Sequence, residues 1–342
     1  MIRTDQELLD EIIRAYKNSP SIYHPSKYWE YLNKVNLKQL VDEGYANFKQ
    51  TVNLNYFNFI AYLRSDQFRW LLSNTPPHKY SPIFFRSRAE INTDKLSRFG
   101  KLIYKFFVSM LWEYASSIDT ERLLDSLAEP LEGNPFRVYY RGRLVSQDLA
   151  NSLIEYYSIT KSSNLSLKNQ LQLYIAELGA GYGRTAYLFL NRFPNAKYFV
   201  IDIPPALFIS QKYLSNIFKN KKIFKFREFT NFGDVKSEML SSSIIFLLPH
   251  QLEQLPRKIF NLFINISSLH EMRPEQIKNY LNLIDKLTMG YFYSKQWYTS
   301  RIPFEDITIT ARDYPIPTHW EEIFFRPARP QRRFFEALYK IR

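Results

Sequence analysis

One stretch near the middle of the chain limits the fold more than any other: an apolar run, three closely spaced glycines and then a helical pattern. Residues 173–178 are apolar apart from one acid and end on a glycine, as is typical of a short buried strand. Gly179, Gly181 and Gly183 follow, and from Gly183 onward apolar residues recur with a helical period. A strand, a glycine turn and a helix bring backbone N–H groups and the positive end of the helix to a ligand. This segment therefore predicts an α/β unit with a binding turn.

Two acids beside this turn indicate which ligand it binds. The dinucleotide fingerprint G-x-G-x-x-G would need a glycine where Arg184 stands. Glu177 lies just before the turn, and a carboxylate suits a cationic amino group better than a pyrophosphate. Asp202 ends the second predicted strand, where an acid hydrogen-bonds ribose hydroxyls. An ammonium, a ribose and an adenine together predict S-adenosylmethionine; a purely structural turn beside a surface acid is the alternative.

The pattern around the turn predicts the domain organisation. From Leu171 onward, strands and helices alternate, which predicts a parallel sheet with both faces covered. Residues 1–145 instead show helical spacing, with one short strand or hairpin expected at residues 136–144. We therefore expect a helical accessory domain over residues 1–145, covering the substrate, and a cofactor-binding domain over residues 146–342. The expected strands are residues 173–178, 198–202, 243–248, 260–266, 290–295 and 334–341.

The end of the fourth expected strand carries the best candidates for catalysis. Asn265 closes this strand, and His270 and Glu271 follow it in the most polar strand end of the chain. A neutral alcohol has a pKa near that of water, about 15.7, so its attack on a methyl group gains from a positioned base. Histidine suits that role because its pKa lies near neutral pH. We interpret His270 as the general base and Glu271 as a residue that orients the imidazole or holds the substrate; the alternative is a histidine that only satisfies a hydrogen bond at the strand end.

Other strand ends provide candidates for ligand contacts. His250 and Gln251 follow the third strand, where polar side chains would face the adenine, although an ordinary loop would have the same residues. Lys295 and Trp297 end the fifth strand and could bind and stack on an acceptor, or Lys295 could be only a solvated strand end. His319, after two prolines, is a candidate for a lid over the substrate. We expect no metal, because no acid pair follows the fourth strand and no cluster of metal ligands is present.

The composition of the chain limits the cellular location and the binding partners that we expect. The net charge is +13, from 46 basic and 33 acidic residues, which permits attraction to nucleic acid, anionic membranes or acidic glycans. The densest basic run, residues 219–227, alternates with apolar residues and is interpreted as an exposed strand or loop with a solvated face; a groove that follows phosphates is the alternative. No apolar run is long enough to cross a membrane, and Met1 is followed by charged residues rather than a secretory segment. Cysteine is absent, which fits a reducing compartment, so we expect a cytoplasmic protein.

Several of these segments together resemble a bacterial family of sugar O-methyltransferases, within the class I S-adenosylmethionine-dependent methyltransferases. The similarity covers about the last 200 residues well and the first 140 more loosely. It implies a Rossmann-like, doubly wound, mostly parallel sheet with an antiparallel C-terminal strand, preceded by an all-helical N-terminal domain. It also implies methyl transfer from S-adenosylmethionine to a sugar hydroxyl in polysaccharide synthesis, with His270 at the reacting centre. The segments that carry the resemblance are residues 143–151, 177–183, 201–206, 265–272, 290–297, 314–320 and 334–339.

The family resemblance and the strand ends together give one cofactor-binding set: Glu177, Gly179, Ala180, Gly181, Gly183, Asp202, Ile203, His250, Gln251 and Asn265. Two other functions stay open. The positive charge would suit a nucleic-acid methyltransferase, but the chain has neither a known nucleic-acid-binding module nor the Asn/Asp-Pro-Pro-Tyr/Phe motif of base methylation. A catalytically silent subunit that binds the cofactor is the second alternative. A sugar or glycan is the expected partner, and a homo-oligomer stays open.

Overall fold

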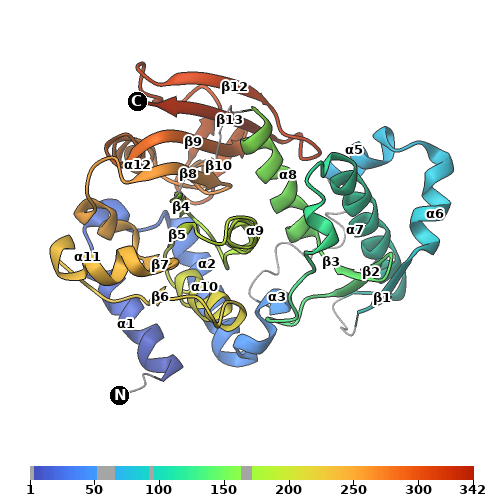
Figure 1. The fold of residues 1–342 in the computed structure, drawn as a ribbon, viewed down its shortest axis with the longest axis horizontal. Coiled ribbons are helices and arrows are strands. Elements are labelled where there is room, and N and C mark those ends of the chain that lie inside the picture. Colours follow the sequence, from blue (N-terminus) through green and yellow to red (C-terminus); the bar gives the residue numbers. More distant parts are fainter. Residues whose placement is uncertain (1–3, 52–65, 92–95, 163–171) are drawn as a thin grey trace. The chain divides into compact units, whose positions relative to one another are not determined.

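The computed structural model describes residues 4–51, 66–91, 96–162 and 172–342 (Figure 1). The chain divides into two compact units, each described here by itself. The first contains residues 1–37, 162–326 and 334–342, and the second contains residues 38–161 and 327–333. These bounds differ from the expected boundary after residue 145. The first 37 residues belong to the same unit as the large sheet, and the helix α8 (Gln147–Ser162) belongs almost entirely to the other unit.

The first unit is built on a large twisted sheet. In the described part of the chain the strands form sheets of eight, three and two strands, and the largest has the order β12-β13-β9-β8-β4-β5-β7-β6. Neighbours from β9 to β6 pair in parallel, whereas β13 pairs antiparallel with β9. The predicted Rossmann-like fold with an antiparallel C-terminal strand is therefore confirmed. The strands are β4 (Tyr174–Leu178), β5 (Lys197–Ile201), β6 (Ile223–Phe224), β7 (Ile244–Leu247), β8 (Phe260–Ile266), β9 (Thr288–Trp297), β12 (Glu321–Pro327) and β13 (Phe334–Ile341).

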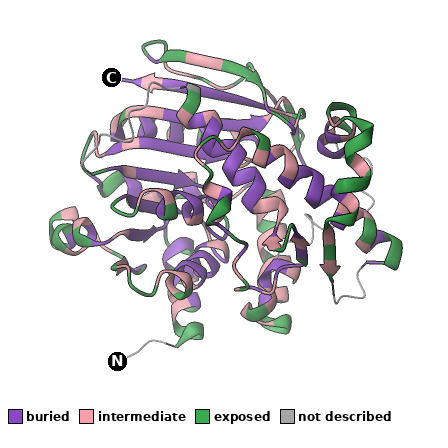
Figure 2. Ribbon diagram, turned by 45° about the vertical axis from the view of Figure 1, so that its right-hand side comes forward, coloured by how far each residue is buried: buried purple, intermediate pink, exposed green. Residues whose placement is uncertain are grey.

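Helices cover both faces of this sheet. On one face, α9 (Arg184–Arg192) and α10 (Ala206–Ile217) pack against β5. On the other, α11 (Phe232–Ser241) and α12 (Pro274–Leu287) contribute to the same core as β4, β5 and β7. Asn231 starts α11 by accepting a hydrogen bond from Gly233 N–H, as expected of an N-cap. Residues on both faces of the central strands are buried, which explains why these strands are almost entirely apolar (Figure 2).

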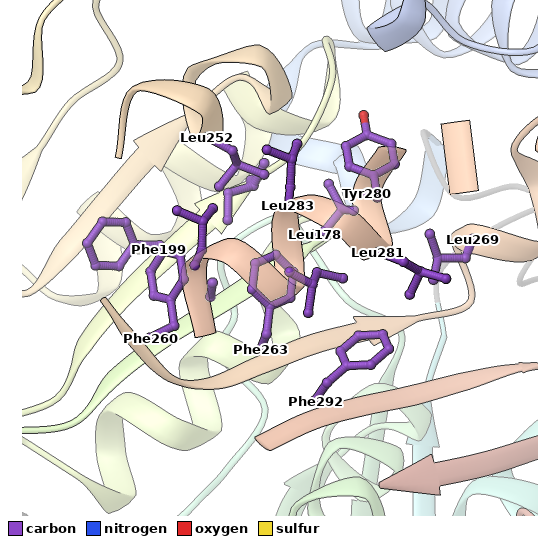
Figure 3. Packing of buried hydrophobic residues seen from close by; sticks show 14 of the residues in the cluster. Leu178, Phe199, Leu252, Phe260, Phe263, Leu269, Tyr280, Leu281, Leu283 and Phe292 are labelled. Atoms are coloured by element: carbon purple, nitrogen blue, oxygen red, sulfur yellow. The ribbon is translucent and has the colours of Figure 1, made fainter. Parts of the chain in front are cut away.

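The core between the sheet and α12 is rich in aromatic rings (Figure 3). Phe260 lies edge-on to Phe199, with ring centroids 5.0 Å apart, and Phe263 lies edge-on to Phe260 at 5.7 Å. Leu281 and Ile284 of α12 fill the same core. Burial of each such side chain contributes about 1.5–3 kcal/mol. This core holds β4 and β8 side by side, and these strands carry the glycine turn and His270.

The N-terminal segment of the first unit lies along the edge at which the parallel strands end. Its helix α1 (Asp5–Lys17) begins with a capping box between Thr4 and Glu7, and packs against α10. The short helix η1 (Ser21–Tyr23) packs against α12. The helix α2 (Lys27–Glu43) follows, and Ser26 caps it, with Trp29 N–H 3.4 Å from Ser26 Oγ. The sequence did not predict that this segment would cover the sheet edge.

The second unit is mostly helical, as expected of the N-terminal region, and its described residues also form a small three-stranded sheet. The hairpin expected at residues 136–144 is present as β2 (Arg137–Tyr140) and β3 (Arg143–Val145), and β1 (Ser87–Glu90) adds a third strand that the sequence pattern did not predict. Its four residues alternate between half-buried and exposed positions and form no apolar side. The sequence pattern therefore did not indicate a strand here. The longer helices of this unit are α5 (Asp66–Asn74), α6 (Tyr80–Phe85), α7 (Arg98–Ile118) and α8.

Three remaining expectations concern segments away from the site. The sequence also predicts a helix over residues 56–72 and a polar linker at 160–169, and residues 56–65 of the first and 163–169 of the second lie outside the described residues. In the basic run at 219–227, Phe224 and Phe226 are buried and Lys225 between them is exposed, which confirms a solvated face. Among the described residues, none of the helices has the length and apolar character needed to span a membrane.

Candidate functional site

The glycine turn after β4 is held by hydrogen bonds of its own backbone. Gly179, Gly181 and Gly183 all have positive φ angles, of 73°, 58° and 91°. Gly179 N–H donates to Ile201 O at 2.8 Å, and Gly183 N–H donates to Ala180 O at 3.0 Å. Gly181 N–H donates to the Asp202 carboxylate at 2.7 Å. The predicted turn and the predicted acid at the end of β5 are thus in direct contact.

The three glycines differ in what surrounds them. A Cβ atom at Gly179 would lie 2.5 Å from Ser268 Oγ, and one at Gly183 would lie 2.8 Å from the Leu214 side chain. A Cβ atom at Gly181 would meet no atom within 4 Å. Gly179 and Gly183 are therefore fixed by packing within the protein, whereas Gly181 faces open space. The absence of a side chain at Gly181 leaves backbone accessible to a ligand.

Asp202 is a buried carboxyl group held between two backbone N–H groups. Burial raises its pKa to about 7, although the N–H groups of Ile203 and Gly181 act in the opposite direction. Ile203 N–H donates to its second oxygen at 2.7 Å. Because an ionised carboxylate accepts about four hydrogen bonds, two backbone donors leave acceptor capacity for hydroxyl groups. This environment suits the predicted contact with ribose.

Glu177 lies inside the protein, on the face of the sheet that α9 covers. Its side chain is 2% exposed, and it accepts a hydrogen bond of 2.8 Å from the Tyr198 hydroxyl on the neighbouring strand. The tyrosine ring in turn packs against Phe189 of α9. The structure thus shows that a hydrogen bond from Tyr198 stabilises Glu177 in a buried position, two residues before Gly179.

The end of β7 places His250 at the site but gives Gln251 a structural role. Gln251 accepts a hydrogen bond from Leu248 N–H and donates one to Arg227 O, both at 2.9 Å, and it is 1% exposed. His250 is partly buried, its ring lies edge-on to Tyr23, and burial lowers its pKa. Its buried Nδ1 atom has no hydrogen-bond partner among the described residues. Such an atom calls for a partner that the protein itself does not supply.

Tyrosines from the N-terminal segment complete this side of the site. Tyr16 donates a hydrogen bond from its hydroxyl to Tyr23 O at 3.1 Å, and Tyr23 donates to Glu253. Burial and the nearby charge of Asp202 raise the pKa of Tyr16. The sequence pattern did not indicate this role, because Tyr16 continues the apolar stripe of an ordinary amphipathic helix.

His270 lies in a buried turn after β8, and its surroundings define its protonation. Its Nδ1 atom lies 3.0 Å from Gln296 Oε1. The amide of Gln296 can take one orientation only, because its nitrogen faces two oxygen atoms of Asn265 and its oxygen faces the N–H groups of Ser268 and His270. Nδ1 therefore carries the proton, and neutral His270 has its lone pair on Nε2. This assignment is the tautomer that a base acting through Nε2 requires.

Nε2 of His270 lies on the side of the ring that faces Glu271. It has no hydrogen-bond partner in the described part of the chain, and Glu271 Oε1 lies 3.6 Å away. Glu271 is itself held by Trp29, whose indole N–H donates to Oε2 at 2.7 Å, and by Ser26, which donates to its backbone oxygen. The carboxylate is thus placed to stabilise a protonated imidazole. The side chain of His270 is fully buried.

Asn265 was predicted to bind the cofactor, and the structure corrects this prediction. Its amide nitrogen donates to Leu178 O and Ser268 Oγ, and its oxygen accepts from Leu269 N–H and Gln296 Nε2. These four bonds use the whole hydrogen-bonding capacity of an asparagine side chain. Asn265 therefore ties the end of β4 to the His270 turn and leaves nothing for a ligand.

The end of β9 lies beside His270. The Trp297 ring stacks on the His270 ring, with centroids 4.9 Å apart and planes 17° apart. Phe334 lies edge-on to both rings. Lys295 is buried, and its ammonium lies 5.5 Å from the centre of the Phe334 ring. The structure thus brings Lys295 and Trp297 together with His270.

His319 was predicted to belong to a lid, but the structure places it elsewhere. Its Nε2 atom lies 2.8 Å from Asp285 Oδ1, and the neighbouring Trp320 donates to the same oxygen. Asp285 comes three residues before β9 begins, whereas Trp297 beside His270 ends β9. A strand of that length spans about 30 Å. His319 is therefore at the opposite edge of the sheet. In the described ranges, no group of three or more His, Asp or Glu side chains could hold a metal.

Comparison with known proteins gives neighbours in structure only. No protein-family model and no curated protein matches the sequence. A Burkholderia thailandensis 1,6-didemethyltoxoflavin-N1-methyltransferase, solved with S-adenosylhomocysteine, is 12% identical over 78% of this chain and 92% of its own, with a TM-score of 0.36. The PH0226 protein from Pyrococcus horikoshii is 12% identical over 55% and 91%, with a TM-score of 0.35. The mitomycin 7-O-methyltransferase MmcR is 10% identical over 56% and 54%, also with a TM-score of 0.35. At these identities the likeness extends to fold alone.

Proposed function

We propose that this protein is an S-adenosylmethionine-dependent O-methyltransferase that methylates a hydroxyl of a sugar or glycan, with His270 as the general base. The observation that carries the proposal is the contact between Gly179 and Ser268. Ser268 precedes His270 by two residues and packs so closely on the glycine turn that a Cβ at Gly179 would lie 2.5 Å from it. The predicted cofactor turn and the predicted base therefore meet at one edge of the sheet.

The residues at this edge suit the proposed cofactor. Gly181 leaves its backbone open to the nucleoside, and Asp202 has acceptor capacity for ribose hydroxyls. His250 Nδ1, buried and lacking a partner among the described residues, would bond the edge of the adenine. Glu177 supplies negative charge beneath the turn. When bound, S-adenosylmethionine would supply a methyl group activated by its sulfonium charge.

The protein itself has two tasks in this proposal: it takes one proton from the acceptor hydroxyl, and it excludes water. His270 Nε2 would take the proton of the acceptor hydroxyl as the oxygen attacks, a role that contributes about 10²–10⁴-fold. Gln296 keeps the other nitrogen protonated, and Glu271 would stabilise the imidazolium formed. The rings of Trp297 and Phe334 exclude water from the imidazole. Lys295 and Trp297 would contact the acceptor.

The test has two parts, binding and turnover. Calorimetry should show uptake of S-adenosylhomocysteine by the purified chain, and absence of uptake would refute the proposal. With tritiated S-adenosylmethionine and a panel of saccharides, His270→Ala should lower turnover about 10²–10⁴-fold and leave cofactor affinity unchanged. His78→Ala, in the other unit, is the matched control. Equal turnover of the His270 variant and the wild type would remove His270 from the mechanism.

A second candidate function is a catalytically silent subunit that binds the same cofactor. The observation favouring it is the complete burial of His270, since an acceptor reaches Nε2 only if Glu271 or Trp29 moves. Calorimetry would then show cofactor uptake, and the saccharide panel would show no methylation. For the nucleic-acid alternative, the discriminating measurement is RNA binding at several salt concentrations. The affinity for RNA falls steeply as salt rises if the protein neutralises several phosphates.

A further inference from the structure

A hairpin next to the His270 turn borders a large cavity. The hairpin consists of β10 (Thr299–Ile302) and β11 (Ile307–Thr310), and β10 packs against the turn at residues 269–271. The cavity, of about 1030 Å³, is lined by the hairpin loop, Lys27 at the start of α2, and Arg273, two residues after Glu271. All of these residues belong to the first compact unit. The cavity therefore lies beside the turn that carries His270.

The loop of this hairpin presents an aromatic ring in a strained conformation. Phe304 is 68% exposed and has a φ of 70°, a left-handed conformation that is unusual for a bulky residue. Its ring lies edge-on to that of Tyr31 of α2, itself more than half exposed, with centroids 6.1 Å apart. Strained residues of this kind cluster at ligand-binding sites, where the ligand gains from their fixed position. Two exposed rings offer a surface for the apolar C–H face of a sugar ring.

The charged groups of the cavity are suited to hydroxyl and carboxylate groups. Glu305 accepts a hydrogen bond from Lys27 N–H through Oε1, whereas its buried Oε2 has no hydrogen-bond partner among the described residues. That oxygen can accept from a hydroxyl donor. The Arg301–Asp306 ion pair is largely exposed, so it contributes little and leaves the guanidinium available to a competing anion. With Lys27 and Arg273, which also pairs with the exposed Glu275, the lining has three cations and two anions.

From these features we infer that the cavity binds an acidic saccharide, with a uronic-acid ring stacked on Phe304 and Tyr31. The carboxylate of the sugar would pair with Arg301 and Lys27, and a sugar hydroxyl would donate to Glu305 Oε2. This inference rests on the proposed function, because it names the acceptor class of the same site. A neutral saccharide would stack on the rings and donate a hydrogen bond to Glu305, but it would not pair with the cations.

Binding of tetragalacturonate to the full chain, with maltotetraose as the neutral comparison, tests this inference by calorimetry. Tetragalacturonate should bind at least 10-fold more tightly, and Arg301→Gln should remove most of that difference. Arg88→Gln, at an exposed ion pair in the other unit, is the matched control and should change nothing. Equal affinity for the two saccharides, or no binding of tetragalacturonate, overturns the inference.

Phe304→Gly separates binding from folding. Glycine tolerates a φ of 70°, so this variant should be at least as stable as the wild type while its affinity for tetragalacturonate falls at least 10-fold. Phe85→Ala, at another highly exposed phenylalanine, should keep full affinity. Unchanged binding by Phe304→Gly overturns the role of the ring. Titration with S-adenosylhomocysteine is an independent measurement. Binding of tetragalacturonate without uptake of S-adenosylhomocysteine refutes the proposed function alone. Uptake of S-adenosylhomocysteine without binding of tetragalacturonate refutes this inference alone.

Discussion

His270 Nδ1 lies 3.0 Å from Gln296 Oε1, and the amide of Gln296 is fixed in orientation by Asn265. A side-chain amide thus determines which nitrogen of a buried imidazole carries the proton. The amide has no charge, so it orients the ring through hydrogen bonding alone.

Neutral His270 should populate a single tautomer with the proton on Nδ1. Long-range proton–nitrogen correlation spectra of histidine-labelled protein at pH 8 should show a protonated Nδ1 and a bare Nε2. In Gln296→Leu this preference should be lost. That variant also leaves buried donors unpaired, at about 1–3 kcal/mol each, so its free energy of unfolding should fall. Detection of a proton on Nε2 in the wild type would contradict the proposed role as base.

The stability of the protein should decrease as pH rises from about 4 to 7, through Asp202. Its pKa is raised from an ordinary 3.8 to about 7 in the folded state, so the folded protein binds more protons than the unfolded chain in this window. The loss amounts to about 4 kcal/mol at most, using about 1.4 kcal/mol per pKa unit. Urea unfolding at several pH values should show this slope in the wild type and in Asp42→Asn, an exposed control, but not in Asp202→Asn. An equal slope in all three proteins would exclude Asp202 as the cause.

Cofactor binding should depend on the same group. Ribose hydroxyls donate hydrogen bonds to the ionised carboxylate and so favour it. The affinity for S-adenosylhomocysteine should therefore rise between pH 6 and 8, with release of a proton on binding. Calorimetry in two buffers of different ionisation enthalpy measures that proton. A pH-independent affinity, with no proton released, would place the ribose away from Asp202.

Alanine at Gly181 and at Gly179 should have opposite consequences. Gly181→Ala meets no protein atom, so it should lose only about 1 kcal/mol of stability from its positive φ, but the added methyl should weaken S-adenosylhomocysteine binding at least 10-fold. Gly179→Ala drives a methyl into Ser268, so its main effect should be a loss of stability. Thermal unfolding and calorimetry on both variants compare the two effects. If Gly181→Ala binds as tightly as the wild type, the turn is structural.

The sequence predicted the sheet well because its strands are buried on both faces and are bounded by sharp polar ends. The ends of β5 and β8, marked by Asp202 and His270, fall where expected for the same reason. The position of His319 could not be predicted, since a partner such as Asp285 is distant in sequence. Asn265 was misassigned because a polar residue at a strand end has the same pattern whether it faces a ligand or another side chain.

The position of α1 and η1 along the strand ends has a kinetic consequence. Tyr16 lies near Asp202, and Tyr23 contacts His250, so this N-terminal segment would cover a nucleoside bound at the turn. Binding of S-adenosylmethionine and release of S-adenosylhomocysteine would then both require this segment to move away. The pace of turnover would then be governed by how often the amino-terminal helix detaches rather than by the methyl shift itself.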